Sequence, residues 1–257
     1  MYIDTHAHLH DPKFPDIEEV VYEYQKFGVD KALNMGCCLE TSVGGKTLSE
    51  RFESIYFGAG YHPSDANDWD KQNAIEIEKL LSHEKCVAVG EIGLDYHYGN
   101  ENKDKQKECF IEQLELAKSY KLPVSIHSRD ATLDTITLLK ENKDKLVYGG
   151  VLHCFSGSVE TVKEYLKLGL YIGFGGTLTF KNARSVLEVA EYLPLDRCLT
   201  ETDCPYLSPE PYRGQRNSPK NIPIIVDKLA TVKGIDLECV KETVYQNALN
   251  LFNKISK

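Results

Sequence analysis

The sequence predicts an α/β protein in which eight parallel strands form a (β/α)8 barrel. Short apolar runs alternate with amphipathic helical patterns eight times along 257 residues, which is the number of units and the length typical of this architecture. The runs are continuously apolar, as expected for parallel strands that are covered on both faces. Metal-binding types of residue follow several runs, where a barrel of this kind carries its chemistry.

The expected strands are the short apolar runs themselves. They cover residues 2–6, 31–36, 54–60, 86–92, 123–127, 148–154, 170–176 and 197–202. Each run is of strand length and is followed by polar residues.

The expected helices lie between these runs and repeat their apolar residues at helical spacing. In residues 105–120, Phe110, Leu114 and Ala117 form such a stripe, with acids and lysines opposite. The weakest pattern covers residues 39–52, because Gly44 and Gly45 interrupt it. The other helices are expected at 16–27, 70–83, 131–142, 158–168, 182–192 and 220–233, with an extra C-terminal helix near 236–254.

The alternative fold is an open doubly wound sheet. That fold typically has a glycine-rich, phosphate-binding turn after an early strand. The first turn here reads DTHAHLHD and contains no glycine. No linker rich in Pro, Gly or Ser divides the chain, so one barrel domain over residues 1–257 is expected. The long irregular stretch 204–221 follows the eighth run, and loops of that length in compact domains are usually functional.

Composition limits the classes of function. The net charge of −9, from 39 acidic and 30 basic residues, argues against broad binding of duplexes, which needs a basic face. A phosphorylated substrate stays compatible, since metal ions and a few arginines supply local positive charge. The eight cysteines lack CxxC spacing and are expected to be free thiols in a reducing cytoplasm. With neither a signal nor a spanning segment in view, we expect a cytoplasmic protein without a membrane or obligate protein partner.

Six residues at the ends of the runs are candidate metal ligands. His6 and His8 follow the first run, and alternate positions of a strand point to one side. Taken singly, each candidate has an ordinary alternative, such as a surface histidine pair, a buried salt bridge or a core histidine. Their recurrence favours a two-metal hydrolytic centre. The six are His6, His8, Glu91, His127, His153 and Asp203.

Two of these residues are also expected to act in catalysis. Glu91 has two oxygens and could bridge two cations. Strand eight closes against strand one in a barrel, so Asp203 would neighbour His6 and His8 and accept the proton of the attacking water. The expected substrate-binding residues are His62, Asp95, Arg129, Glu201 and Arg213.

Several of these substrate contacts have alternatives. Arg129 could instead pair with Asp130 or Asp134, and Glu201 could lie deeper as an orienting residue. The loop residues Arg213, Arg216 and Asn217 are expected to reach back over the mouth, although a solvated surface loop is the alternative.

Six blocks of the chain together resemble one family. The blocks YIDTHAHLH, GYHPSD, GEIGLDYH, HSRDA, HCFSG and ETDCPYLSPEPYRGQRNSP occur in order over almost the whole sequence. They are similar to those of the TatD family of metal-dependent deoxyribonucleases, within the amidohydrolase-like barrels. The family usually has an acid or amide immediately after HxHL, where this chain has His10 and then Asp11. This departure leaves the ligands intact and the first loop less defined.

The resemblance implies a barrel with one or two divalent ions that hydrolyses phosphodiester bonds of DNA, often as a 3′–5′ exonuclease. His6, His8, Glu91 and Asp203 would hold the first ion, and Glu91, His127 and His153 the second. A hydroxide held between the ions would attack phosphorus. Nuclease chemistry suggests Mg²⁺ or Mn²⁺, whereas imidazole ligands also suit Zn²⁺, Fe²⁺ or Co²⁺.

The implied partner is DNA, as a strand end or a single strand. Two other functions are also compatible with the sequence. One is an enzyme of the same architecture that acts on a small phosphoester, lactone or amide. The other is a metal-binding protein whose role is interaction rather than turnover.

Overall fold

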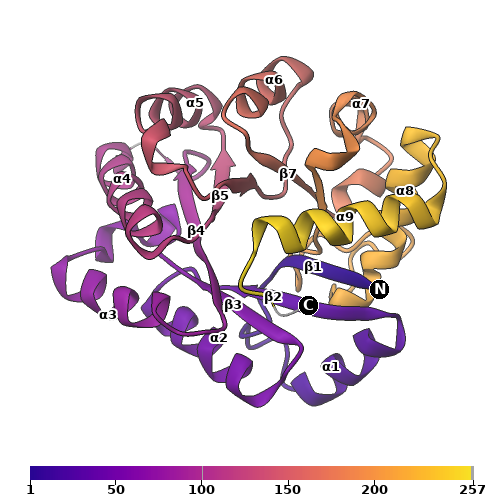
Figure 1. Ribbon diagram of the computed structural model, residues 1–257, viewed down its shortest axis with the longest axis horizontal. Coiled ribbons are helices and arrows are strands. Elements are labelled where there is room, and N and C mark those ends of the chain that lie inside the picture. Colours follow the sequence, from indigo (N-terminus) through magenta and orange to yellow (C-terminus); the bar gives the residue numbers. More distant parts are fainter. Residues whose placement is uncertain (100, 256–257) are drawn as a thin grey trace.

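The computed structural model describes residues 1–99 and 101–255, and its eight strands form one parallel sheet in chain order. In Figure 1 the helices surround these strands. The predicted (β/α)8 barrel, the TIM-barrel architecture, is therefore confirmed. The strands are β1 (Tyr2–Ala7), β2 (Val29–Met35), β3 (Ile55–Ala59), β4 (Cys86–Asp95), β5 (Val124–Arg129), β6 (Gly150–Leu152), β7 (Tyr171–Phe174) and β8 (Cys198–Thr200).

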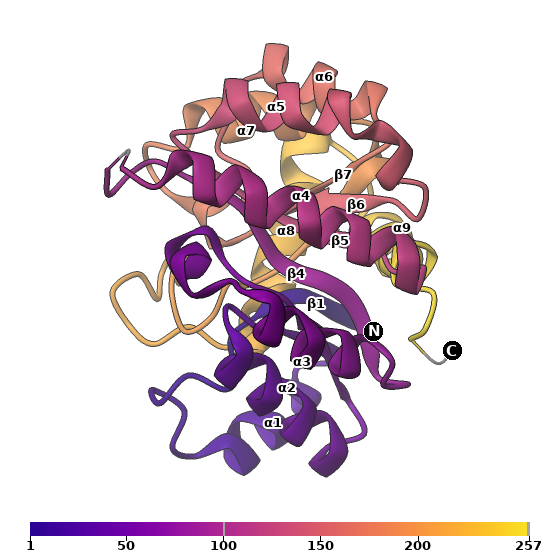
Figure 2. The same ribbon diagram turned by 90° about the vertical axis from the view of Figure 1, so that its left-hand side faces the viewer.

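The helices alternate with the strands, and two of them follow β8. Figure 2 shows α1, α2 and α3 on one side of the strands and α5, α6 and α7 on the other. The predicted extra C-terminal helix is α9. The helices are α1 (Ile17–Lys26), α2 (Leu39–Arg51), α3 (Lys71–Leu81), α4 (Lys103–Tyr120), α5 (Thr132–Glu141), α6 (Val159–Lys167), α7 (Arg184–Tyr192), α8 (Ile222–Lys233) and α9 (Leu237–Leu251).

The barrel closes where the chain beyond β8 meets β1. The closure is a single parallel bridge with a few further hydrogen bonds rather than a long ladder. The backbone N–H of Asp203 donates to the carbonyl of His6 at 2.9 Å. The buried carboxylate of Asp4 accepts hydrogen bonds from the N–H and the hydroxyl of Thr202, at 2.9 and 2.5 Å. Residues after β8 therefore lie beside residues of β1, as the sequence predicts.

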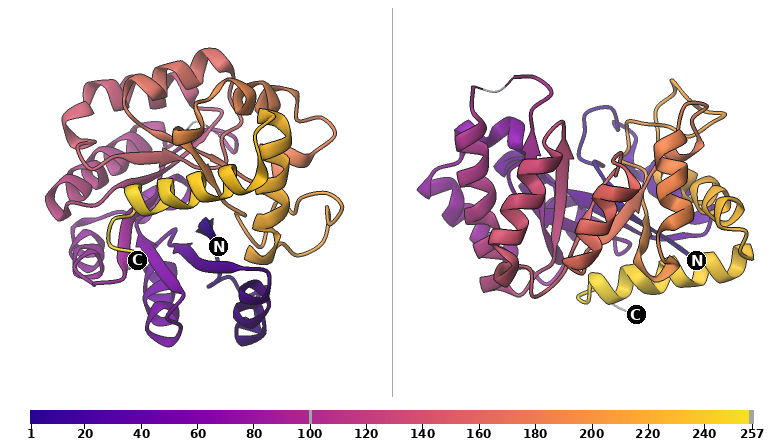
Figure 3. Two further views of the ribbon diagram at one scale, coloured as in Figure 1. Left: turned by 45° about the vertical axis from the view of Figure 1, so that its right-hand side comes forward. Right: turned by 90° about the horizontal axis from the view of Figure 1, so that it is seen from above.

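Helix α9 packs across one end of the barrel. In the right-hand view of Figure 3 it lies at the end where the chain begins, and the loop after β8 projects from the opposite end. Phe252 and Ile255 are buried there against Ile3, Leu33 and other apolar side chains of the barrel interior. Their burial closes the amino-terminal end of the barrel, which leaves the carboxyl-terminal end of the strands for the site.

Helix α2 exists although its sequence pattern is the weakest. A Cβ atom on Gly45 would lie 2.6 Å from the Asn34 side-chain nitrogen and 3.1 Å from the Phe57 Cβ. Gly45 therefore lets α2 approach β2 and β3 closely, and the cost in helix propensity is offset by packing. Strands β6 and β8 are shorter than the predicted 148–154 and 197–202, because the chain leaves the sheet to form the loops of the site.

Lys85 holds the end of α2 against the start of β4. Its ammonium donates hydrogen bonds to the carbonyls of Ser49, Phe52, Glu53 and Ile55, at 2.8 to 3.4 Å. A cation at the end of a helix satisfies carbonyls that lack partners within the helix. We expect Lys85→Met to lower the free energy of unfolding by about 1–3 kcal/mol, measured by urea denaturation.

The matched control for this variant is Lys79→Met. Lys79 is exposed and pairs with Glu76 on the surface of α3, so its loss should change the free energy of unfolding by less than about 1 kcal/mol. Equal effects of the two substitutions would contradict the role given to Lys85.

All eight cysteines are free, as predicted. Cys86, Cys109, Cys198 and Cys204 are buried, and Cys239 is exposed. Within residues 1–99 and 101–255, no helix combines the length and the apolar character needed to cross a bilayer.

Candidate metal centre

The six predicted ligands meet at the carboxyl-terminal end of the barrel. The barrel brings neighbouring strands into register there, so that the N–H of His153 donates to the carbonyl of Ile126 on β5 at 3.1 Å. His6 lies in β1, Glu91 in β4 and His127 in β5, while His8, His153 and Asp203 lie just beyond β1, β6 and β8.

The first cluster contains His6, His8, Asp203 and one oxygen of Glu91. His6 Nε2 lies 3.3 Å from His8 Nε2 and 3.4 Å from Glu91 Oε2. Asp203 Oδ1 lies 3.3 Å from His8 Nε2 and 3.9 Å from His6 Nε2. Ligands of a tetrahedral ion with bonds of about 2.0–2.2 Å stand roughly 3.3–3.6 Å apart. The spacing of this cluster therefore fits one divalent ion.

The second cluster uses the other oxygen of Glu91. Glu91 Oε1 lies 2.8 Å from His127 Nδ1 and 2.7 Å from His153 Nε2. These two nitrogens are 3.2 Å apart. The two oxygens of one buried carboxylate thus face two different groups of histidines.

Hydrogen bonds on the far side of the rings fix which nitrogen faces the site. His8 Nδ1 lies 3.0 Å from the carbonyl of Met35, and His127 Nε2 lies 3.0 Å from Asp95 Oδ2. Both acceptors require an N–H, so His8 Nε2 and His127 Nδ1 keep a lone pair directed into the cluster. A lone pair that faces another ring nitrogen at 3.2–3.3 Å needs a proton or a metal cation between the two atoms. The donor set therefore fits metal ions.

The electrostatics of the site also favour cations. Burial would raise the pKa of Glu91, but His153, His62 and His6 hold it well below its ordinary value. Burial would lower the pKa of His153, yet Glu91 and Glu201 hold it well above the ordinary value. The buried carboxylates thus stabilise positive charge in the site, and metal ions can supply that charge in place of protons.

A cavity of about 370 Å³ opens onto three of the six candidate ligands, His127, His153 and Asp203. This volume lies at the small end of the range for small-molecule sites. The cavity is lined by His127, Ser128, Arg129, His153, Cys154, Ser156, Thr177, Asp203, Tyr206 and Leu207.

Comparison with known proteins decides the family. A family model described as TatD related DNase matches residues 3–253. The chain belongs to the TatD family. It is 42% identical over 253 residues to the uncharacterized metal-dependent hydrolase YabD of Bacillus subtilis, covering 98% of this chain and 99% of that protein. The protein is therefore a metal-dependent hydrolase of this family.

Other relatives extend the comparison. The chain is 36% identical over 246 residues to the 3′-5′ ssDNA/RNA exonuclease TatD of Cronobacter sakazakii, covering 93% of this chain and 92% of that protein. The crystal structure of the TatD homologue YjjV from Escherichia coli matches with a TM-score of 0.92 at 32% identity, covering 98% of both chains.

Two of the predicted substrate contacts lie against the second cluster of this TatD-family site. His62 Nε2 is 3.7 Å from Glu91 Oε1, and its ring lies 4.4 Å from that of His127. Burial lowers the pKa of His62 to about 4, so its imidazole is neutral near pH 7. Asp95 is buried and bonds the outer nitrogen of His127. This contact suits a residue that positions His127, and a contact of Asp95 with substrate stays a prediction.

The other three predicted substrate contacts differ in how exposed they are and in what they contact. Arg129 is exposed and lines the cavity. Glu201 is fully buried, with Oε1 3.6 Å from His153 Nδ1. Gly173 leaves room for the Glu201 carboxylate, since a Cβ there would lie 2.4 Å from Oε2. The alternative of an orienting residue therefore fits Glu201 better than a substrate contact.

The arginines of the loop after β8 do not converge on the ligands. Arg213 lies over the ring of Phe180, with its guanidinium carbon 4.1 Å from the ring centre. Arg216 forms two hydrogen bonds to the carboxylate of Asp16, at 2.7 and 2.8 Å. Asn217 is buried at the base of the loop. The prediction that Arg216 and Asn217 reach over the mouth was wrong, because both hold the loop to the barrel.

Cys37 lies at the site although it is not among the predicted site residues. Its Sγ lies 3.8 Å from both His8 Nδ1 and Glu91 Oε2. Cys37 follows β2 as the predicted ligands follow their strands, so the same positional signal could have found it. Ser125, whose Oγ lies 3.1 Å from His6 Nδ1, sits inside an apolar run and gave no such signal.

Asp95→Asn should weaken metal binding through His127. An asparagine can present its amide N–H to His127 Nε2, which would favour the tautomer with a proton on Nδ1, the atom that faces the site. Loss of such an outer partner typically weakens metal affinity by about 10–100-fold. Competition with a chromophoric chelator measures this change.

Asp134→Asn is the matched control, because Asp134 bonds Tyr96 and Lys107 away from the ligands. Unchanged metal affinity in Asp95→Asn would contradict the positioning role of Asp95. An equal loss of metal affinity in Asp134→Asn would contradict it as well.

Proposed function

We propose that the protein is a two-ion phosphodiesterase that removes nucleotides from the 3′ end of single-stranded DNA. The observation that carries the proposal is that the two oxygens of Glu91 face different histidines: Oε2 lies 3.4 Å from His6 Nε2, and Oε1 lies 2.7 Å from His153 Nε2. A carboxylate shared in this way could hold two ions, which would stabilise the attacking and leaving oxygens of a displacement at phosphorus.

Each ion would have its own ligand set. His6, His8, Asp203 and Glu91 Oε2 would hold one, and His127, His153 and Glu91 Oε1 the other. The bound ions would polarise the phosphate and lower the pKa of the attacking water. Zn²⁺, Fe²⁺, Co²⁺ and Mn²⁺ suit imidazole better than Mg²⁺ does, while Mg²⁺ and Mn²⁺ are usual in nuclease chemistry.

The residues of the chain would then bind and orient the substrate. Asp203 is accessible from the cavity and would accept the proton of the attacking water. Arg129 would bind phosphate oxygens through its planar guanidinium group. His62, neutral near pH 7, would donate a hydrogen bond to the same phosphate. Arg213, in the loop after β8, would contact a longer DNA strand farther from the ligands.

A strand end suits this site better than a duplex. The cavity of about 370 Å³ is small, and a net charge of −9 disfavours a groove-binding mode that needs many phosphate contacts. The name of the Cronobacter sakazakii relative, a 3′-5′ ssDNA/RNA exonuclease, supports the polarity and the class of substrate.

The experiment is digestion of a 5′-labelled single-stranded oligonucleotide by metal-loaded protein, with a panel of small phosphoesters, lactones and amides in parallel. We expect a ladder that shortens from the 3′ end, disappears with chelator and returns with added divalent ions. Turnover of the small substrates with an intact oligonucleotide would replace the nuclease by a small-molecule hydrolase.

A further inference from the structure

Resting on the proposed function, we propose that Tyr98 and Tyr206 are stacking platforms for nucleobases at the rim of the cavity. Each tyrosine is exposed, carries a cation against its ring and belongs to a loop at the carboxyl-terminal end of the barrel. The strand would thus be held by its bases as well as by its phosphates.

Tyr98 extends the Arg129 side of the cavity. It follows β4 and is 82% exposed. The guanidinium carbon of Arg129 lies 5.3 Å from the centre of its ring, and Arg129 Nη1 lies 3.4 Å from its hydroxyl. Arg129 itself lines the cavity. A phosphate held by Arg129 would therefore bring a neighbouring base within reach of Tyr98.

Tyr206 lines the cavity and belongs to the loop after β8. It is 45% exposed, and Lys13 Nζ lies 4.2 Å from the centre of its ring. Its hydroxyl donates to Asp11 Oδ2 at 2.9 Å, and its N–H donates to the carbonyl of Asp203 at 3.0 Å. The ring is therefore fixed next to a predicted catalytic residue.

An aromatic ring beside a cation is the usual element of binding to single strands. Bases stack on the ring whatever their identity, and the cation meets the phosphates. The net charge of −9 leaves less long-range attraction for a polyanion than a basic protein has. Stacking is the kind of contact that compensates for this without sequence preference.

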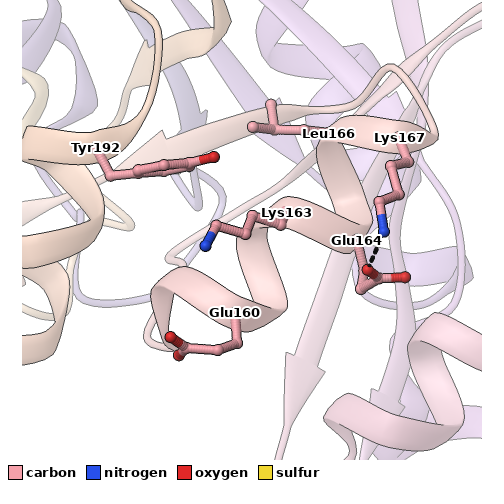
Figure 4. A pocket seen from close by; sticks show the side chains of 6 residues that line it. All are labelled: Glu160, Lys163, Glu164, Leu166, Lys167 and Tyr192. Atoms are coloured by element: carbon pink, nitrogen blue, oxygen red, sulfur yellow. Dashed lines mark hydrogen bonds and ion pairs between the residues drawn. The ribbon is translucent and has the colours of Figure 1, made fainter.

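Tyr192 offers a matched control away from the ligands. Figure 4 shows it beside Lys163 in a hollow formed with residues of α6. Tyr192 is 47% exposed, and Lys163 Nζ lies 5.2 Å from its ring centre. It reproduces the pairing of an exposed tyrosine with a cation, but the hollow also contains Glu160 and Glu164 and includes none of the metal ligands.

The test compares two strands of equal length on the metal-loaded protein. One is an oligothymidylate, and the other carries stable abasic sugars at its 3′ end, so that its phosphates are kept and its terminal bases are lost. Loss of one stacked base weakens binding roughly 5- to 150-fold. We expect the KM of the wild type to be higher by that factor for the abasic-ended strand than for oligothymidylate. Stacking that is equally strong in the ground state and the transition state changes KM and leaves kcat unchanged.

The variants Tyr98→Leu and Tyr206→Leu should raise KM for oligothymidylate by a factor in the same range and leave the abasic-ended strand unchanged. Tyr98→Phe and Tyr192→Leu should keep the wild-type KM for both strands. A wild type that digests both strands with equal KM would overturn the stacking role and leave the nuclease standing. Equal losses on both strands in the leucine variants would also overturn it. Failure to digest either strand would overturn both proposals.

Discussion

Asp203→Asn should leave the barrel folded and lower kcat on single-stranded DNA by about 10²–10⁴-fold, the contribution typical of a general base. Asp203 has a φ of +54°, and asparagine adopts this left-handed conformation as readily as aspartate does. The amide therefore fits the position beside His8 without backbone strain. It cannot take a proton from the attacking water. Initial rates at saturating metal measure the effect.

Two controls accompany this variant. The fluorescence of Trp69, the single tryptophan, which is buried, shows whether the fold is kept. Asp196→Asn changes an exposed aspartate in the 3₁₀ turn Leu195–Arg197 and should keep wild-type kcat. An Asp203→Asn protein that retains more than a tenth of the wild-type activity would contradict the role of Asp203 as the proton acceptor.

Glu91→Gln should reduce the number of tightly bound ions from two to at most one. The amide keeps one oxygen and replaces the other with an N–H₂ group, which cannot bind a cation. Loss of a hydrogen-bond partner of a metal ligand already weakens metal affinity by about 10–100-fold. Loss of a ligand shared by both ions should therefore lower the metal affinity of the weaker site by at least about 100-fold. Mass spectrometry of metal content after dialysis measures this number.

The control for Glu91→Gln is Glu108→Gln, because Glu108 pairs only with Lys105 on an exposed face of α4 among the interactions of the described residues. It should keep the wild-type metal content. Two ions retained at wild-type affinity in Glu91→Gln would mean that Glu91 does not bridge them.

The order of the elements could be predicted because parallel strands covered on both faces read as continuous apolar runs. The metal ligands could be predicted for a related reason. A barrel brings the ends of its strands together, so residues as distant as His6 and Asp203 become neighbours. The position of a residue relative to the end of a strand therefore predicted whether it lies at the site, whereas the sequence separation between residues did not.

What the sequence could not provide were partners chosen by tertiary structure. Arg216 and Arg213 look alike in the sequence, but one binds Asp16 from the first loop and the other lies on Phe180. Gly45 looks like a helix breaker until the approach of α2 to Asn34 is known. Glu201 follows a strand as Asp203 does, yet it points into the barrel and bonds the N–H of Cys154.

A titration of metal-free protein with divalent ions, followed in each sample by digestion of a labelled single-stranded oligonucleotide, tests the central claim most directly. We expect two bound ions per chain, with activity that rises steeply as the second ion binds. Full activity at one ion per chain would contradict the two-ion site. A protein that holds two ions and leaves the oligonucleotide intact would contradict the nuclease.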